Sequence, residues 1–167
     1  MGKIVGCNKM EDSLKATAAN IAKVKAYLKQ EEGIDYSEDV IRNWIEPSHR
    51  GRIETPQGYS DVTRSCGDGL ELFLRINQDR IIEARFASSG CICTIAASNM
   101  TAVLAEGREV YDAFDIEAQT VMDALGGLPP GEDHCAELAC TALREALRNY
   151  LTFKNEPWKR TYPKSKP

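Results

Sequence analysis

The sequence predicts an α+β fold, in which an antiparallel hairpin packs against helices. Apolar and polar residues alternate over residues 70–77, and a second strand-like run, residues 80–86, follows a short turn, which is typical of a β-hairpin. Beyond Cys91 the apolar residues recur at helical spacing, and they do so again near the end of the chain. With 167 residues, 43% of them hydrophobic and 28% charged, the chain can bury one core, so we expect one domain with appendages.

The first helix is expected over residues 11–32, where apolar residues form a narrow stripe rich in alanine. Asp12 or Ser13 would cap its N-terminus, and Gly33 would end it. Such a stripe suits packing on the domain, on a partner or on a second copy of the chain. A homodimer is therefore among the expectations.

The second helix is expected over residues 36–45, because Ser37 and the two acidic residues after it suit a first turn and Pro47 cannot continue a helix. Residues 48–63 are mostly polar. We expect an irregular connection there, or a short first strand around residues 52–54.

Three more helices are predicted after the hairpin, over residues 92–107, 115–125 and 133–151. The chain is accordingly divided into an N-terminal helical extension, a central domain and a C-terminal tail, which are residues 1–35, 36–152 and 153–167.

The charge and hydropathy patterns exclude several classes of function. A formal net charge of −4 argues against a nucleic-acid-binding protein, which normally carries a basic patch. The first residues lack the apolar core of a signal peptide, and no later run approaches the roughly 20 apolar residues of a membrane span. We therefore expect a cytoplasmic protein without membrane or nucleic-acid partners, whose six cysteines are thiols or metal ligands.

Three separated segments carry residues that suit a metal site. Cys66 and Asp68 precede the hairpin, Cys91 follows it, and His134 and Cys135 begin the last predicted helix. Because the two hairpin strands are antiparallel, Cys66 and Cys91 should lie at the same end of the sheet. Cysteine sulfurs together with carboxylate or imidazole ligands at the ends of several elements indicate one exposed metal site. They are less typical of side chains buried in the hydrophobic core.

The residue types indicate a labile site. Cys91 and Cys135 lie near predicted helix N-termini, where the helix dipole is expected to lower the pKa of a thiol. Three cysteines with either Asp68 or His134 as the fourth ligand suit zinc or an iron-sulfur cluster, and a hard ligand beside thiolates suggests a metal that can leave. Two further cysteines, Cys93 and Cys140, are interpreted as small buried apolar residues.

A specific set of motifs, in matching order and spacing, then carries a family resemblance: Tyr36-Ser37-Glu38-Asp39-Val40-Ile41, Pro47, Gly51, Cys66-Gly67-Asp68, Ala84-Arg85-Phe86, Gly90-Cys91, Ile95-Ala96-Ala97-Ser98, Leu128-Pro129-Pro130 and His134-Cys135-Ala136-Glu137-Leu138-Ala139. Through these motifs the chain resembles the IscU/NifU family of iron-sulfur cluster assembly scaffolds, from residue 36 to about residue 150. The resemblance implies a three-stranded antiparallel sheet covered on one face by helices, here with an additional N-terminal helix.

The resemblance also implies a function, that of a scaffold rather than an enzyme. Sulfur from a cysteine desulfurase of the IscS/NifS type and ferrous iron would form a labile 2Fe-2S cluster on Cys66, Cys91 and Cys135. Asp68 or His134 would complete the site, and zinc would occupy it in the absence of a cluster. By similarity, Cys135 is the expected persulfide acceptor and Asp68 keeps the cluster exchangeable for transfer to apo-proteins.

Two departures from the family pattern lie close to these residues. Gly131 and Glu132 stand where the family typically has valine and lysine, which argues against recognition by a DnaK-type chaperone. Cys93 stands where the family usually has a small residue, so it is expected to be an accessory thiol near the cluster.

The main alternative is a zinc-containing sulfur-acceptor protein of the related SufU type, a sulfurtransferase. That type has an insertion before its last cysteine and lacks the histidine, whereas this chain has His134 and no obvious insertion between Cys91 and Cys135. A structural zinc domain would need a closed site of four ligands, which Asp68 argues against. The scaffold is therefore the favoured interpretation.

Overall fold

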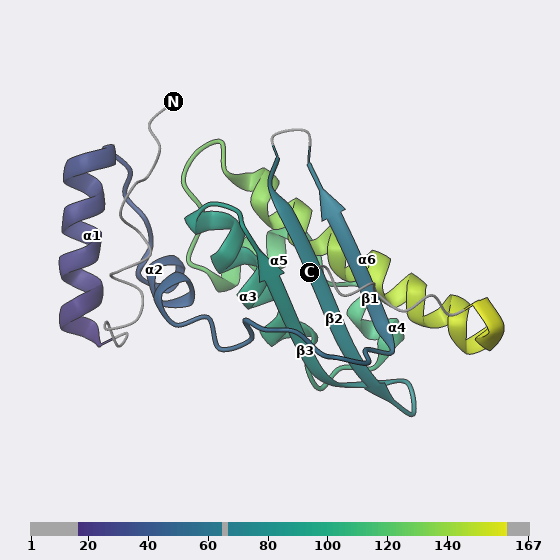
Figure 1. Cartoon of the computed structure of the whole chain (residues 1–167). Coiled ribbons are helices and arrows are strands. Elements are labelled where there is room, and N and C mark those ends of the chain that lie inside the picture. Colours follow the sequence, from purple (N-terminus) through teal and green to yellow (C-terminus); the bar gives the residue numbers. More distant parts are fainter. Residues whose placement is uncertain (1–16, 65–66, 160–167) are drawn as a thin grey trace.

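The computed structural model describes residues 17–64 and 67–159, in which three strands are followed by a set of helices (Figure 1). The helices and strands, in chain order, are α1 (Ala18–Glu32), α2 (Glu38–Ile45), β1 (Gly58–Thr63), β2 (Gly69–Asn77), β3 (Arg80–Ser88), α3 (Ile92–Ala105), α4 (Val110–Ala113), α5 (Ala118–Ala124), α6 (Asp133–Asn155) and a short 3-10 helix (Pro157–Lys159). The α+β class is confirmed.

The sheet has three antiparallel strands in the order β1-β2-β3, as predicted. The turn between β2 and β3 is made by Gln78 and Asp79, whose φ angles of 50° and 59° lie in the left-handed region that this kind of two-residue hairpin loop requires. Leu70, Leu72 and Leu74 are fully buried, as the alternation predicts, but Phe73 on the opposite face of β2 is buried too. The hairpin therefore supplies one apolar face to the core.

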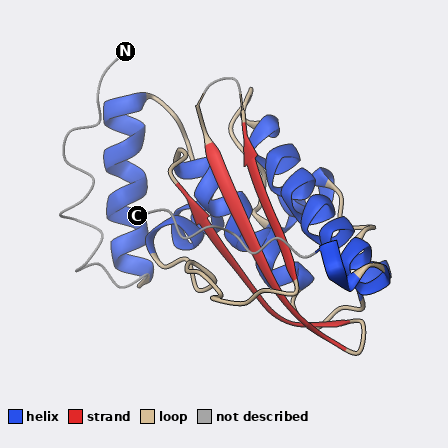
Figure 2. Ribbon diagram, turned by 45° about the vertical axis from the view of Figure 1, so that its right-hand side comes forward, coloured by secondary structure: helices blue, strands red, loops and turns tan. Residues whose placement is uncertain are grey.

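Helices α3 and α6 cover this apolar face, with α3 against β3 and α6 against β1 and β2. In both views the helices that follow the strands lie behind them, while α1 stands to one side, and no described helix lies on the other face (Figure 2). Small residues let the helices approach closely; fully buried examples are Ala96 and Ala97 of α3 and Ala139, Ala142 and Ala146 of α6. This close packing fixes where the two helices begin.

Helix α1 stands beside α2 at the edge of the molecule (Figure 1). Within this helix, Ile21 and Leu28 are the buried side chains. It begins at Ala18 with Thr17 as its N-cap, so it is shorter than the predicted helix of residues 11–32, whose proposed caps lie outside the described residues. Gly33 ends the helix as expected, in a left-handed conformation with φ of 71°.

The first strand was predicted in the wrong place. Residues 52–54 form no strand, and β1 lies at Gly58–Thr63 instead. The polar sequence of β1 does not look like that of a buried strand. The buried Ser60 nevertheless has a partner, because its hydroxyl donates a hydrogen bond of 2.8 Å to the Ala142 carbonyl of α6. A polar residue is thus tolerated on the buried face.

Two predicted helices have different bounds. The expected helix of residues 115–125 is preceded by the separate turn α4 and begins only at Ala118, while α6 runs on to Asn155. The second helix agrees with the prediction, since the Ser37 hydroxyl accepts the Val40 N–H as an N-cap. The division into residues 1–35, 36–152 and 153–167 stays a prediction.

We predict that Gly58→Ala destabilises the fold. A Cβ atom at Gly58 would lie 2.6 Å from the Ala146 carbonyl oxygen, so β1 or α6 would have to move. Overpacking of this kind costs about 1–3 kcal/mol of unfolding free energy, measurable by urea denaturation. Gly69→Ala is the matched control, because its nearest contacts would be at 3.8 and 3.9 Å. Equal stability of the two variants would contradict the assigned packing of β1 on α6.

Candidate metal centre

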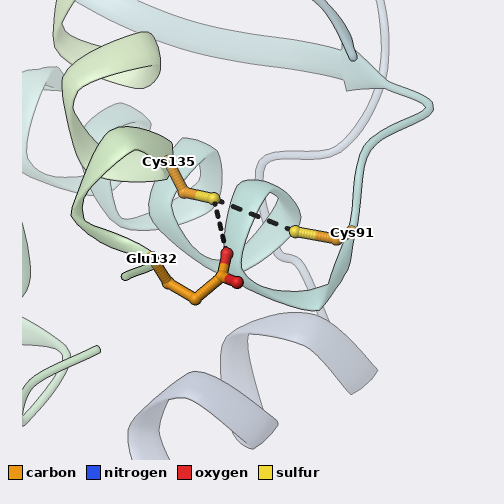
Figure 3. Close-up of side chains that lie close together, drawn as sticks. All are labelled: Cys91, Glu132 and Cys135. Carbon is orange, nitrogen blue, oxygen red and sulfur yellow. Dashed lines mark hydrogen bonds between the residues drawn. The ribbon is translucent and has the colours of Figure 1, made fainter. Parts of the chain in front are cut away.

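Two cysteine sulfurs meet where α3 and α6 begin. Cys91 is the N-cap of α3, and Cys135 lies in the first turn of α6. Their Sγ atoms are 3.8 Å apart and point toward each other (Figure 3). Cys91 is exposed, whereas Cys135 is fully buried. The pair therefore has one sulfur that solvent can reach and one that the core holds in place.

Thr94 contacts both sulfurs from the first turn of α3. Its buried hydroxyl lies 3.4 Å from the Cys91 Sγ and donates to the Cys135 Sγ at 3.4 Å. A side chain at Gly90 would not fit beside it, because a Cβ there would lie 2.6 Å from a methyl group of Thr94. Gly90 therefore allows this hydroxyl to reach the sulfurs.

Glu132 is the third potential ligand. Its Oε2 lies 3.4 Å from the Cys135 Sγ, and one ligand atom from each of Cys91, Glu132 and Cys135 lies within 4.8 Å of the others. Glu132 occupies the N-cap position of α6 but makes no capping hydrogen bond with its side chain. The carboxylate is therefore directed at the sulfurs and not at the helix backbone (Figure 3).

The electrostatics of the pair assign different protonation states to its two thiols. The hydrogen bond from Cys135 holds the pKa of Cys91 far below its usual range, with a second contribution from Cys93. The same interaction with Cys91, together with burial, raises the pKa of Cys135. Two thiolates this close would repel each other, so one proton is shared within the pair.

The prediction of a lowered pKa is therefore right for Cys91 and wrong for Cys135. A helix N-terminus favours a thiolate at both positions, but the neighbouring sulfur outweighs it at Cys135.

The other cysteines that the structure describes are buried, as predicted. Cys93 is 1% exposed, and its pKa is raised by the hydrogen bond to Cys91 and by burial. Burial also raises the pKa of Cys140, to about 11. Both are neutral thiols, and Cys93 lies next to the sulfur pair.

Three of the predicted ligands need separate comment. Cys66 lies outside the described residues. Asp68 is half-buried just before β2, and His134 makes a 2.9 Å contact from Nδ1 to the Gly131 carbonyl oxygen. Within the described residues neither joins the group of three ligands, so their roles as ligands stay predictions.

Arg64 connects the β1–β2 loop with the start of α6. Its guanidinium donates to the His134 carbonyl at 3.1 Å and lies 3.9 Å from the Glu137 carboxylate, while its backbone N–H donates to the Asp68 carbonyl at 2.9 Å. The loop that carries Asp68 is thus attached to the helix that carries Cys135.

Sequence reasoning missed Glu132 as a potential ligand and did not single out Thr94. The available signal was spacing, because each lies three residues from a cysteine at a helix start and side chains three apart share a helix face.

Among the described residues, no helix is both long and apolar enough to cross a membrane.

Known proteins resemble the part of the chain that carries this site. Residues 35–156 match the family described as NifU-like N terminal domain. The iron-sulfur cluster assembly scaffold protein IscU 1 of Archaeoglobus fulgidus is 35% identical over 117 residues, which is 70% of this chain and 76% of that protein. The scaffold protein IscU of Aquifex aeolicus is 30% identical over 120 residues, again 70% of this chain and 76% of the relative.

A solved structure shows the same fold. The putative iron-sulfur cluster assembly scaffold protein for the SUF system of Fervidobacterium islandicum AW-1 superposes with a TM-score of 0.57 and 23% identity. The match covers 67% of this chain and 96% of that one.

We predict that Cys91 is the most reactive of the four described cysteines in metal-free protein. An ordinary thiol alkylates about tenfold more slowly for each pH unit below its pKa of about 8.5. Because the pKa of Cys91 is lowered, its rate of alkylation by iodoacetamide should stay nearly constant as the pH falls below that value. The rate for each cysteine is followed by peptide mass spectrometry. In Cys135→Ala, which lacks the thiol donor, the rate should regain part of the pH dependence. Earlier modification of Cys93 would contradict the assignment.

Proposed function

The chain belongs to the family of NifU-like N-terminal domains, and on that premise we propose that it is a scaffold for the assembly of 2Fe-2S clusters and their transfer to apo-proteins. The observation that supports this most directly is the sulfur pair of Cys91 and Cys135, which are 3.8 Å apart at an open end of the fold. The cluster is cargo here and not a resident cofactor.

The arrangement suits temporary binding. One sulfur comes from the buried Cys135 and gives a fixed attachment, whereas Cys91 is open to solvent and to a partner protein. We propose that Cys66, from the loop between β1 and β2, supplies the third thiolate. Asp68 or His134 would complete the site, because a cluster with one ligand other than sulfur is easier to release than one with four thiolates.

Sulfur enters the proposed reaction as a persulfide. The thiolate of the scaffold attacks the outer sulfur of a desulfurase persulfide, and the desulfurase thiolate leaves. Cys91 suits this step, because it is exposed and its pKa is lowered. The Cys135 sulfur can then attack the outer sulfur on Cys91 while its proton passes to the Cys91 sulfur, which leaves as the thiol. We therefore keep Cys135 as the residue that holds the persulfide, with Cys91 as its first acceptor.

The proposed partners are a cysteine desulfurase and apo-proteins that receive the cluster. A DnaK-type chaperone is not among them. Leu128 packs partly against the core and Pro129 is buried. A chaperone could therefore bind this segment as an extended peptide only if it first detached from the rest of the domain. The negative charge of Glu132 further disfavours a groove that is selective for lysine.

We predict that Cys91→Ala and Cys135→Ala each abolish stable cluster assembly. Each substitution removes one of the two sulfurs that the structure brings together. The measurement is anaerobic reconstitution with ferrous iron, cysteine and a desulfurase, followed by absorption and Mössbauer spectra.

Cys140→Ala is the matched control, because Cys140 is also a buried cysteine of α6 but does not belong to the ligand group. It should assemble the cluster as the parent does. If the parent bound zinc, accepted sulfur and never formed a cluster, the scaffold proposal would be wrong and the SufU-type alternative would replace it.

We further predict that Asp68→Ala slows transfer of the assembled cluster to an apo-ferredoxin. The half-buried Asp68 lies at the mouth of the β1–β2 loop and would provide the exchangeable oxygen ligand. Transfer is followed by the circular dichroism of the acceptor cluster. Asp61→Ala, a change of the same charge on an exposed residue of β1, should leave the rate unchanged. Equal rates for Asp68→Ala and the parent would remove Asp68 from the mechanism.

A further inference from the structure

We propose that Glu132 is a metal ligand, and that with Cys91 and Cys135 it forms a site for a single Zn²⁺ or Fe²⁺ ion. The inference builds on the proposed function, because the same two cysteines would carry the cluster. It adds a ligand at a position where the family pattern has lysine, and it concerns one ion before sulfur arrives.

Two of the three distances between the ligand atoms fit tetrahedral coordination. Two thiolates about 2.3 Å from zinc at the tetrahedral angle are about 3.8 Å apart, and a thiolate and a carboxylate oxygen are about 3.5 Å apart. The structure has 3.8 Å between the two sulfurs and 3.4 Å between the Cys135 Sγ and the Glu132 Oε2. Cys91 lies within 4.8 Å of the same carboxylate. Binding of an ion would therefore bring the Cys91 sulfur and the Glu132 carboxylate to about 3.5 Å from each other.

The donor set selects the class of ion. Two sulfurs exclude Mg²⁺ and Ca²⁺, which prefer oxygen ligands, and favour the softer divalent ions of the first transition series. Binding displaces the remaining thiol proton to solvent, because only thiolates coordinate the metal. Two thiolates and one carboxylate carry three negative charges, which a divalent cation largely neutralises. The fourth position remains open for water or for another ligand.

Neighbouring groups hold the proposed ligands in place. The His134 Nε2 lies 3.8 Å from the Glu132 Oε2, while its Nδ1 contacts the Gly131 carbonyl oxygen at 2.9 Å, so the imidazole is positioned beside the carboxylate. The Thr94 hydroxyl donates to the Cys135 sulfur. Contacts of this kind orient the ligands of metal sites and add to affinity. In this arrangement His134 lies beside the Glu132 carboxylate and is not one of the three ligands of the single ion, which leaves its role toward the cluster unchanged.

The test is the affinity for Zn²⁺, measured by competition with a chromophoric chelator, together with the absorption spectrum of the Co²⁺-substituted protein. Glu132→Gln keeps the size of the side chain but removes its charge, and should weaken Zn²⁺ binding by at least about tenfold, the lower end of what loss of an outer-shell partner costs. Its Co²⁺ spectrum should keep the thiolate charge-transfer bands and change in the ligand-field region.

Two further variants separate coordination from charge. Glu132→Asp keeps a carboxylate and should recover part of the affinity. Glu145→Gln removes the same charge from an exposed residue of α6 outside the ligand group, so it should bind Zn²⁺ as the parent does. If Glu132→Gln matched the parent in both affinity and Co²⁺ spectrum, Glu132 would not be a ligand.

The outcomes also distinguish the two proposals. A Glu132→Gln variant with unchanged metal affinity, in a protein that assembles clusters, would overturn the inference and leave the scaffold function standing. If the parent protein never assembled a cluster, but Glu132→Gln weakened its Zn²⁺ binding, the scaffold function would be overturned and Glu132 would stand as a metal ligand.

Discussion

The packing of two helices side by side on one face of a small sheet determines the whole site. Helix α3 lies against β3 and α6 against β1 and β2, and buried alanines allow both to sit close to the strands. As a result the starts of the helices meet, and Cys91 and Cys135 come within 3.8 Å of each other. A bulkier contact between α6 and β1 would move one sulfur relative to the other, so a core property controls a surface function.

Meeting helix starts also create an electrostatic imbalance that a cation corrects. Both N-termini favour negative charge, but the closeness of the sulfurs allows only one of them to ionise, and the nearby Glu132 adds a further negative charge. The buried Cys135 therefore stays protonated in the metal-free protein. A divalent ion would remove the repulsion and let both sulfurs ionise, so a site that is poor for two anions would suit a metal.

The sequence predicts those features that local patterns determine. The hairpin follows from the alternation around Leu72, and the start of α3 at Cys91 follows from the change to helical spacing. It could not predict β1, because the Ser60 hydroxyl donates its hydrogen bond to the Ala142 carbonyl, 82 residues later. The raised pKa of Cys135 and the approach of Glu132 to the sulfurs likewise depend on how α6 packs beside α3. The motifs gave the family and several ligand candidates, but which candidates converge depends on tertiary contacts.

The sulfurs that face each other across α3 and α6 are separated by 44 residues of chain. An ion bound to both is therefore a reversible cross-link between distant segments, available to the folded chain and hardly to the unfolded one. By mass action each tenfold excess of free ion over its dissociation constant adds about 1.4 kcal/mol to the free energy of unfolding. The persistence of the folded protein would then follow the supply of metal in its surroundings, and releasing the cargo would bring the chain closer to unfolding.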